Sequence, residues 1–412
     1  MRRSTRPLAL LGAALLVASV LSVSMAAAPS TASRRAEVYA VSGPSTITLT
    51  GHGYGHGHGM SQYGAEGAAR QGLTWQQIIG FYYPGTSWGE LRGPISVWLT
   101  GDTTDDVVVA AQAGLTVTRL TPRKSWTLPA NGARQWRVNG LAGGRSQVQF
   151  VKGRGWRTWK VFRGDAELSA AKKRLTLVTP SGSKDYRGRL RSASPVPGGA
   201  ARDTVNILSM ESYLRGVVPL EIPASWSPDA VRAQSVAART YAAAERSHPN
   251  ARHYEICDTT QCQVYGGVGA EHPAATQAIR DTARQGLTYD GRPAFTQFSA
   301  SSGGWTSAGS TPYLVAQADP YDGWEGNAVH TWTKTVNDSA LERHYPGIGD
   351  LTSVEISGRD GNGDWGGRVQ EMTLVGTRGR AATTGDTLRT LLGLRSSWFT
   401  VSVAPLQART RG

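Results

Sequence analysis

One acidic side chain, Glu221, lies in an otherwise apolar segment and is a candidate proton donor. Its neighbours along the chain are Val217, Val218, Pro219, Leu220, Ile222 and Pro223. Apolar neighbours withdraw a carboxyl group from water, which disfavours the charged form and raises the pKa toward neutrality. The segment therefore indicates a general acid. The alternative interpretation is a solvated loop glutamate beside a buried strand.

The two cysteines of the chain, Cys257 and Cys262, lie in one short segment, and His253 precedes the first of them by four residues. Thiolate and imidazole are ligands that Zn²⁺ prefers, and three protein ligands leave the fourth position to water. A disulfide is the alternative, because an oxidising exterior favours it. The residues alone leave both interpretations open.

The first 28 residues have the pattern of a signal peptide. Arg2, Arg3 and Arg6 precede an apolar run over residues 8–23, and small residues follow at 26–28. This order predicts export and a secreted, wall-associated protein. Retention of the apolar run as an uncleaved anchor stays open.

The net charge of the chain is +14, and removal of residues 1–28 with their three arginines leaves +11. A strongly basic protein is attracted to polyanions. For an exported protein we expect anionic wall polymers or a membrane surface as partners. The sequence has no lysine-rich tract or aromatic stacking motif, so we expect no nucleic acid. The 13 tryptophans offer faces on which sugar rings can stack.

The pattern of glycines and apolar residues predicts an α+β protein, a β-rich mixed fold with a few helices. A Gly/His-rich segment covers residues 40–90, with short helices over 61–70 and 74–83. Residues 91–210 alternate strand-like runs with turns, which indicates a β-rich region. A catalytic core follows over 211–403, and 404–412 form a flexible tail. In that core Ser227 and Pro228 have the residue types that begin a helix, here one that stops before Pro249, and another helix follows Pro273 and ends near Gly286.

Several motifs together resemble the stage II sporulation protein D family, also called SpoIID/LytB. They are YLRGVVPLEIPASW, AVRAQSVAARTYA, the cysteine pair ending in QVYGG, FSASSGG, GDTLRTLLGLRSSWF and GHGYGHGHGMSQYGAEGAARQG, and they span most of residues 50–402. The resemblance implies a peptidoglycan lytic transglycosylase, which cleaves glycan strands between N-acetylmuramic acid (MurNAc) and N-acetylglucosamine (GlcNAc) without adding water. It implies that Glu221 is the catalytic acid and then the base. It also favours zinc at His253, Cys257 and Cys262 over the disulfide.

The Gly/His block departs from the family pattern because it opens the exported chain instead of following the LGLRSSWF segment. Chain termini often lie close together, so a permuted order can rebuild the same site. We therefore expect residues 51–85 to return to the cleft, where His56 or His58, Ser61 and Gln62 would contact substrate. An independent N-terminal module and a metal held by His52, His56 and His58 are the alternatives.

Further site residues are assigned to substrate binding around this cleft. The SSGG turn with Ser301, Ser302 and Gly303 would form a cleft wall, as the family motif suggests, and Tyr63 and Arg239 complete the set. The run from Asp360 to Glu371 has carboxylates at calcium-loop spacing. Trp365, however, stands where that loop requires glycine, so we expect a polar hairpin turn and no calcium.

Two other functions stay compatible with the sequence. One is a non-catalytic wall-binding protein or autolysin modifier, with a wall amidase as a candidate partner. The other is a zinc-dependent wall hydrolase. The products of the reaction separate them: anhydro-sugar ends support the transglycosylase, reducing ends or free amines support a hydrolase, and binding without products supports the modifier.

Overall fold

The first described strands of the chain pair with its last ones. The structure is a computed structural model, which describes residues 36–406 apart from 172 and 250. Strand β2 (Ser45–His52) lies between β21 (Thr331–Asn337) and β25 (Phe399–Pro405), antiparallel to both. Every second residue of β2 is buried, and Ile47 and Leu49 face a common core with the later strands. The predicted signal peptide at 1–28 lies outside the described residues.

A second sheet covers the same core. Strand β1 (Glu37–Ala40) pairs with β22 (Leu351–Arg359), and the order continues to β23 (Val369–Gly376) and β24 (Arg380–Thr383). The neighbouring helical segments are α7 (Asp338–His344), η2 (Pro346–Ile348), η3 (Asp364–Gly366) and α8 (Gly385–Leu392). This core contains only residues from 41–49 and 332–401 among the described ones. The expected catalytic core at 211–403 is therefore divided, because its last seventy residues pack with the N-terminal strands.

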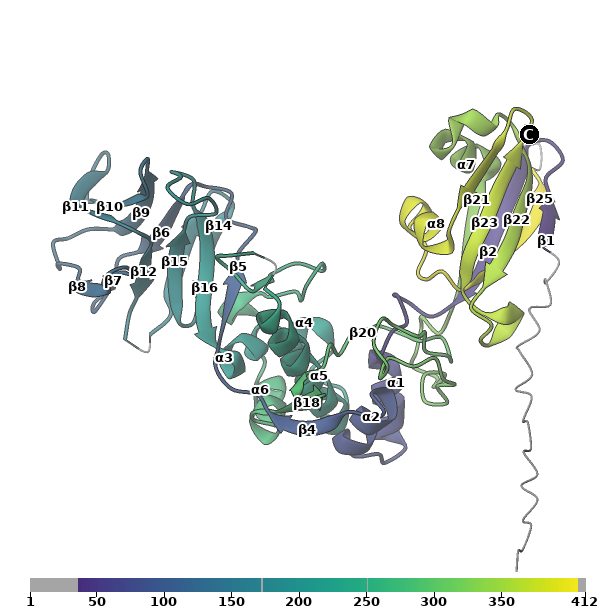
Figure 1. The fold of residues 1–412 in the computed structure, drawn as a ribbon, viewed down its shortest axis with the longest axis horizontal. Helices are drawn as coiled ribbons and strands as arrows, with labels where there is room; N and C mark the ends of the chain where they lie inside the picture. Colours follow the sequence, from purple (N-terminus) through teal and green to yellow (C-terminus); the bar gives the residue numbers. More distant parts are fainter. Residues whose placement is uncertain (1–35, 172, 250, 407–412) are drawn as a thin grey trace, which may run out of the picture. The chain divides into compact units, whose positions relative to one another are not determined.

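The β-rich region expected over 91–210 forms two larger sheets (Figure 1). One has the order β17 (Ile256–Cys257), β5 (Pro94–Trp98), β16 (Asp203–Ser209), β15 (Arg189–Ala193), β12 (Ala166–Ser169), β7 (Thr116–Arg119) and β8 (Lys124–Thr127). The other has the order β11 (Arg157–Arg163), β10 (Arg145–Val151), β9 (Gln135–Leu141), β6 (Asp106–Ala110), β13 (Leu175–Thr179) and β14 (Gly182–Tyr186). All neighbours in them are antiparallel except β17 and β5.

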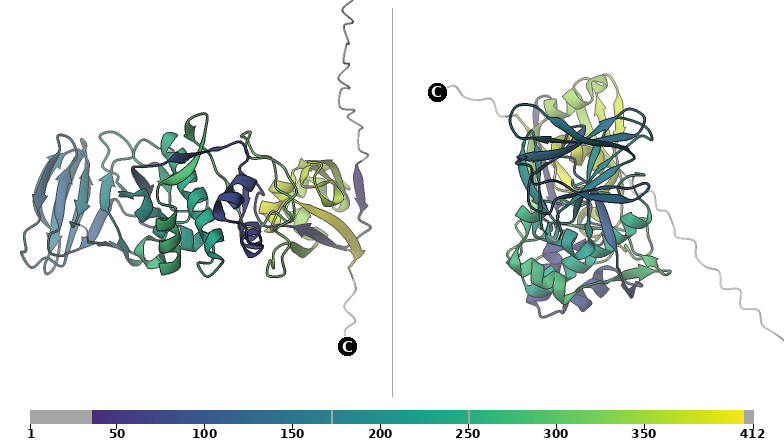
Figure 2. Two further views of the ribbon diagram at one scale, coloured as in Figure 1. Left: turned by 90° about the horizontal axis from the view of Figure 1, so that it is seen from below. Right: turned by 90° about the vertical axis from the view of Figure 1, so that its left-hand side faces the viewer.

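Helix α5 (Pro228–Ser247) is buried on nearly every side, as its many alanines allow. It contacts α1 (Gln62–Arg70), α2 (Trp75–Tyr82), α4 (Val218–Glu221) and α6 (Pro273–Asp281), and Figure 2 shows these helices grouped around it. Helix α3 (Met210–Arg215) also contacts α5, as do β18 (Gln285–Tyr289) and β19 (Arg292–Pro293) of a small sheet that β4 (Ser87–Glu90) completes. Segment η1 (Gly267–Ala270) contacts α3, and β3 (Met60–Ser61), which pairs with β20 (Phe298–Ser299), contacts α1 and α2.

The predicted fold class is confirmed: the chain is a β-rich mixed α+β fold with several antiparallel sheets. The predicted helices at 61–70, 74–83 and 228–248 are also confirmed. The helix after Pro273 ends at Asp281, earlier than expected, because Gln285 already begins strand β18. No helix among the described residues is long and apolar enough to cross a membrane.

Candidate active site

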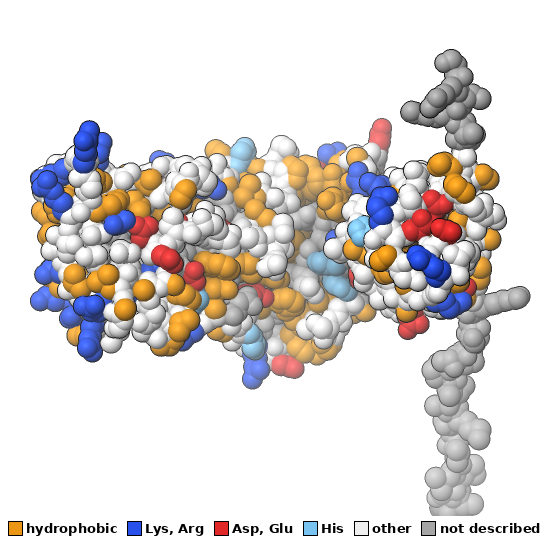
Figure 3. Space-filling view, turned by 90° about the horizontal axis from the view of Figure 1, so that it is seen from above, with side chains coloured by type: hydrophobic (Ala, Val, Ile, Leu, Met, Phe, Trp, Pro, Cys, Tyr) orange, Lys and Arg blue, Asp and Glu red, His pale blue; other side chains and the backbone are white. Residues whose placement is uncertain are grey.

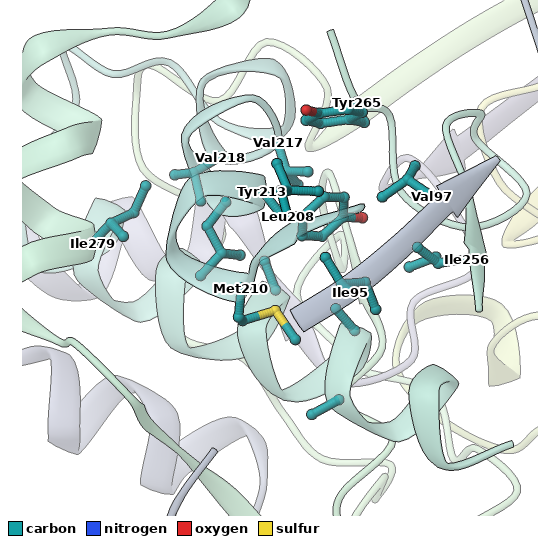
Figure 4. Close-up of a cluster of buried hydrophobic side chains, with 14 of the residues drawn as sticks. Ile95, Val97, Leu208, Met210, Tyr213, Val217, Val218, Ile256, Tyr265 and Ile279 are labelled. Carbon is teal, nitrogen blue, oxygen red and sulfur yellow. The ribbon is translucent and has the colours of Figure 1, made fainter. Parts of the chain in front are cut away.

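Glu221 is the last residue of α4, and a buried apolar core fixes that short helix. Figure 4 shows Tyr213, Val217 and Val218 packed with Ile95 and Val97 of β5. The Ser209 side chain begins α3 by accepting a hydrogen bond from the backbone N–H of Ser212. The chain is thereby held on both sides of the turn that leads to Glu221.

The Glu221 carboxyl group is half-buried, and burial raises its pKa to about 7. The apolar run supplies only part of this burial, because Val217, Val218 and Ile222 are buried whereas Leu220 is 46% exposed. Two hydrogen bonds act against the shift. One comes from the Val264 backbone N–H at 3.3 Å, and the other from the Gln62 side chain. A carboxyl group with this pKa can hold a proton at neutral pH and release it.

The Gly/His block returns to Glu221 through a series of backbone contacts. Tyr54 bridges Ser301, and β3 pairs in parallel with β20. The Met60 N–H donates to the Gln297 carbonyl at 3.2 Å. The helix that follows carries Gln62 to the Glu221 carboxyl group. The structure thus brings together residues about 160 positions apart, and the alternative of an independent N-terminal module is wrong.

Glycine is required where this block meets its neighbours. Gly57 and Gly59 both have φ in the left-handed region, at 78° and 65°. A Cβ at Gly57 would collide with the Arg368 guanidinium, and one at Gly59 would collide with the Gln297 carbonyl oxygen. The repeated glycines therefore serve close backbone approach, as the sequence pattern indicates.

A cavity of about 240 Å³ opens onto Glu221. It is lined by residues of five segments: His56, Glu221, Tyr241, Thr260, Gln261, Cys262, Val264, Gln297 and Phe298. Glu221 is the only carboxylate among these lining residues of the described chain. The side-chain amides of Gln261 and Gln297 and the hydroxyl of Thr260 can form hydrogen bonds with sugar hydroxyls. The rings of Tyr241 and Phe298, with centroids 6.3 Å apart, give the cavity aromatic walls.

His56 lines the cavity as a neutral ring. Burial, and then the nearby His58, Arg389 and Arg368, lower its pKa to about 3. Its Nδ1 accepts a hydrogen bond from the His58 N–H at 2.9 Å, and the two rings stack with centroids 4.9 Å apart. His58 Nδ1 in turn meets the Ser307 carbonyl at 3.2 Å. Of the two predicted histidines, His56 reaches the cavity and His58 supports it.

The predicted substrate contacts Ser61, Ser301, Ser302 and Gly303 do not line the cavity, because these residues are buried around Asp322. The Asp322 carboxylate is fully buried. It accepts hydrogen bonds from the Ser61 and Ser301 hydroxyls at 2.5 and 2.7 Å, and from the Ser302 and Gly303 N–H groups at 3.0 Å each. The serines therefore join the Gly/His block to the segment that follows β20.

Arg239 and Tyr63, also predicted to bind substrate, do not line the cavity either. Arg239 is fully buried and forms a bidentate ion pair with Glu211 at 2.8 and 3.0 Å. A charged side chain in the middle of a buried helix is costly unless an opposite charge pairs with it. Tyr63 packs against Trp226 and Trp324, with centroids 4.8 and 6.1 Å away, outside the cavity lining.

Cys257 and Cys262 are joined by a disulfide, which was the alternative to zinc. His253 Nε2 donates a hydrogen bond to the Asp203 carboxylate at 2.5 Å. Among the described residues no group of three His, Cys, Asp or Glu side chains could hold a metal ion. The residues as arranged therefore do not fit zinc, either at this loop or at His52, His56 and His58.

The disulfide holds the loop that carries Val264 against Glu221, so we expect its reduction to slow any reaction that Glu221 catalyses. A displacement of about 1 Å in an active site can cost ~100-fold in rate. Treatment with a thiol reductant should lower turnover of substrate by about 10- to 100-fold without unfolding the chain, whereas a Cys257→Ser/Cys262→Ser variant should be slow and indifferent to reductant. Two free thiols and one bound zinc per chain in the untreated protein would contradict this arrangement.

The segment from Asp360 to Arg368 connects β22 and β23 as the predicted polar hairpin. Asp360 Oδ1 accepts hydrogen bonds from the backbone N–H groups of Asn362 and Arg368, each at 3.1 Å. The carboxylate therefore orders its own turn.

Sequence reasoning missed Tyr241, Val264, Gln297 and Phe298. A signal existed for two of them, because Phe298 is the first residue of the FSASSGG motif and of strand β20, and Gln297 directly precedes it. Val264 contributes only a backbone N–H, which no side-chain pattern reports.

Comparison with known proteins agrees with the motifs. Residues 199–289 match the family model "SpoIID: Stage II sporulation protein". The stage II sporulation protein D of Bacillus amyloliquefaciens is 29% identical over 223 residues, which cover 48% of this chain and 61% of that protein. The protein of the same name from Bacillus subtilis is 30% identical over 182 residues, covering 38% and 52%.

A further relative is named amidase enhancer. This protein of Bacillus subtilis is 37% identical over 135 residues, which cover 31% of this chain and 17% of its own length. The chain thus spans less than two thirds of each of these relatives. The predicted family resemblance is confirmed, and its strongest part contains Glu221, the disulfide and helix α5.

Proposed function

We propose that the protein is a secreted peptidoglycan lytic transglycosylase, because residues 199–289 match the SpoIID family model and the chain is similar to two stage II sporulation proteins D. It would cleave the bond between MurNAc and GlcNAc and leave a 1,6-anhydromuramoyl end. One observation carries the proposal: a half-buried Glu221, with its pKa raised by burial to about 7, is the only carboxylate among the lining residues of its cavity in the described chain.

In the proposed mechanism Glu221 acts twice. In its protonated form it donates its proton to the glycosidic oxygen. The bond from that oxygen to C1 of the MurNAc sugar then breaks through an oxocarbenium-like state. The carboxylate then removes the proton from the C6 hydroxyl of the same sugar, and that oxygen bonds to C1. The acid is regenerated and no water enters, so one carboxyl group is enough.

The contacts of Glu221 suit both steps. The Val264 N–H and the Gln62 side chain hydrogen-bond to the carboxyl group and stabilise its charged form after the proton has left. Burial opposes that charge, so the group can take the next proton readily. A pair of carboxylates would be expected for ordinary hydrolysis by either of the two usual routes. The cavity lining offers no second one among the described residues.

A non-catalytic role as a wall-binding modifier is the second candidate, because one relative carries the name amidase enhancer. In that case the same cavity would hold glycan without cleaving it, and a wall amidase would be the partner. A zinc-dependent hydrolase is not proposed, because the disulfide occupies the expected ligands.

Product analysis separates these functions. We expect purified glycan strands incubated with the protein to yield fragments with anhydromuramoyl ends, each lighter by one water than the hydrolytic product, as measured by mass spectrometry. Reducing ends would mean hydrolysis by a second group. Binding of strands without any fragments would support the modifier and contradict the enzyme.

A further inference from the structure

Nearly all of the net charge lies in the β-rich region. Residues 107–164 contain 11 Lys or Arg and no Asp or Glu. Among the described residues only one of these cations, Arg137, has a carboxylate partner, Asp106. Elsewhere arginines such as Arg239 and Arg359 are paired with carboxylates. Figure 3 shows Lys and Arg side chains projecting from the part that holds β8, β10 and β11, at the left of the view.

Three of these cations converge on a single ring. The charged groups of Arg119, Lys124 and Lys160 lie 6.0, 5.6 and 5.2 Å from the centroid of Trp126. Trp126 is on β8, at the edge of one sheet, and Lys160 is on β11, at the edge of the other. Trp126 stacks on Phe162 of β11 at 5.5 Å, which joins the two edges. We call these three cations and Trp126 the basic-aromatic surface.

This arrangement opposes folding while it lacks a partner. Arg119 and Lys124 are directly opposite each other on β7 and β8, where like charges are destabilising. Because all three charges lie near one ring, the distances between them are comparable to the Debye length, about 10 Å at 0.1 M salt. Dissolved salt therefore screens their repulsion only in part. A chain of negative charges would relieve it by binding.

From this geometry we infer that the basic-aromatic surface binds a linear phosphodiester polymer of the cell wall, an alditol-phosphate chain. Phosphodiesters repeated along a flexible chain can meet Arg119, Lys124 and Lys160 in turn, and the planar arginine fork suits phosphate oxygens. The inference concerns a site separate from the Glu221 cavity and does not depend on the proposed reaction.

Other polyanions fit this surface less well. A single-stranded nucleic acid needs free aromatic faces for base stacking. Lys160 lies over both Trp126 and Trp159, and Arg137 lies 4.3 Å from the ring of Trp156. A membrane surface favours exposed apolar groups that enter the lipid. Val161, 42% exposed, is the one large exposed hydrophobic residue in 107–164 among the described residues.

Binding of the full chain to poly(glycerol phosphate) tests the inference. The surface variant is Arg119→Gln/Lys124→Gln/Lys160→Gln. The matched control, Arg292→Gln/Lys334→Gln/Arg343→Gln, removes three exposed cations elsewhere. We expect the surface variant to lose about tenfold or more in affinity and to show a weaker dependence on salt. The control should lose less than about twofold, as for a change in net charge alone.

Three outcomes would overturn the inference. They are no binding by the wild-type chain, equal losses in the two variants, and tighter binding of a single-stranded DNA of equal charge. The folding of both variants is checked by thermal unfolding, because the surface variant also loses the attraction of its cations to Trp126 and the hydrogen bond from Arg119 Nε to the Pro122 carbonyl. Glu221→Gln should bind the polymer as the wild type does, so failure of the proposed reaction would leave this result intact.

Discussion

Replacement of Glu221 by glutamine should remove nearly all glycan cleavage while glycan binding persists. The amide keeps the shape of the side chain but has no proton to give to the glycosidic oxygen. General acid catalysis is worth about two to four orders of magnitude in rate, so we expect a loss of that size, measured as anhydromuramoyl ends formed per unit time. Glu325→Gln, an exposed glutamate outside the cavity lining, is the matched control and should cleave normally.

The pH dependence supplies an independent readout of the same group. Burial raises the pKa of Glu221 to about 7, and the first step needs the protonated form. Cleavage by the wild-type chain should therefore decline as pH rises through about 7. Because this pKa is raised above the ordinary carboxyl pKa of 4.5, the folded chain holds a proton on Glu221 that the unfolded chain has already released. The group therefore makes folding less favourable as the pH rises above 4.5. Glu221→Gln should then be no less stable than wild type at pH 8, and near-normal turnover by a folded variant would refute the assignment.

Local patterns along the sequence were sufficient to predict the helices and to mark Glu221 as a candidate, and the family resemblance then favoured its role as the acid. Thr74 and Gln77 form a capping box at α2, and Pro228 stands at the start of α5. These signals act over three or four residues, which is why they can be identified in a single sequence. Glu221 was predicted by the same kind of local reasoning, although Leu220 turned out to be exposed and Tyr241 and Phe298, from distant segments, form walls of its cavity.

Polar residues were harder to assign because burial depends on distant partners. Ser301 and Ser302 belong to a motif that resembles a ligand-binding turn, yet both hydroxyls bind the carboxylates of Asp322 and Asp319. Arg239 likewise has its partner, Glu211, 28 positions away in the chain. Sequence spacing carries no information on such pairs, and a buried charge with a partner resembles an exposed functional one when only its residue type is known.

The cysteines illustrate the same limit in a different way. Two thiols at this spacing are compatible with zinc and with a disulfide. The choice depends on where His253 points. Its ring meets Asp203 of β16, a strand that lies about fifty positions earlier in the chain. The family resemblance favoured zinc, and the local geometry favours the disulfide.

Loss of the Asp322 carboxylate should have the largest effect on stability. It receives hydrogen bonds from the Ser61 and Ser301 hydroxyls and from His330 at 2.8 Å. Burial alone would raise its pKa, but the hydrogen bonds from His330, Ser61 and Ser301 lower it overall. Asp322→Ala would leave these donors buried without an acceptor, and removal of one partner from a buried ion pair typically costs about 3–5 kcal/mol. We expect a loss of this size in the free energy of unfolding, measured by denaturant titration.

The matched control is Asp364→Ala, because Asp364 also faces a histidine, His52, at 3.3 Å but is 72% exposed. Its loss should cost at most about 1 kcal/mol. The pKa of His330 is raised, chiefly by its hydrogen bond to Asp322, so the pair stabilises the fold below the ordinary value of 6.5 and loses this contribution as pH rises through the folded pKa. The penalty of Asp322→Ala should therefore be larger at pH 6 than at pH 9. Equal, small losses of unfolding free energy in the two variants would mean that Asp322 does not hold the Gly/His block in place. Some other contact would then have to position Gln62 beside Glu221.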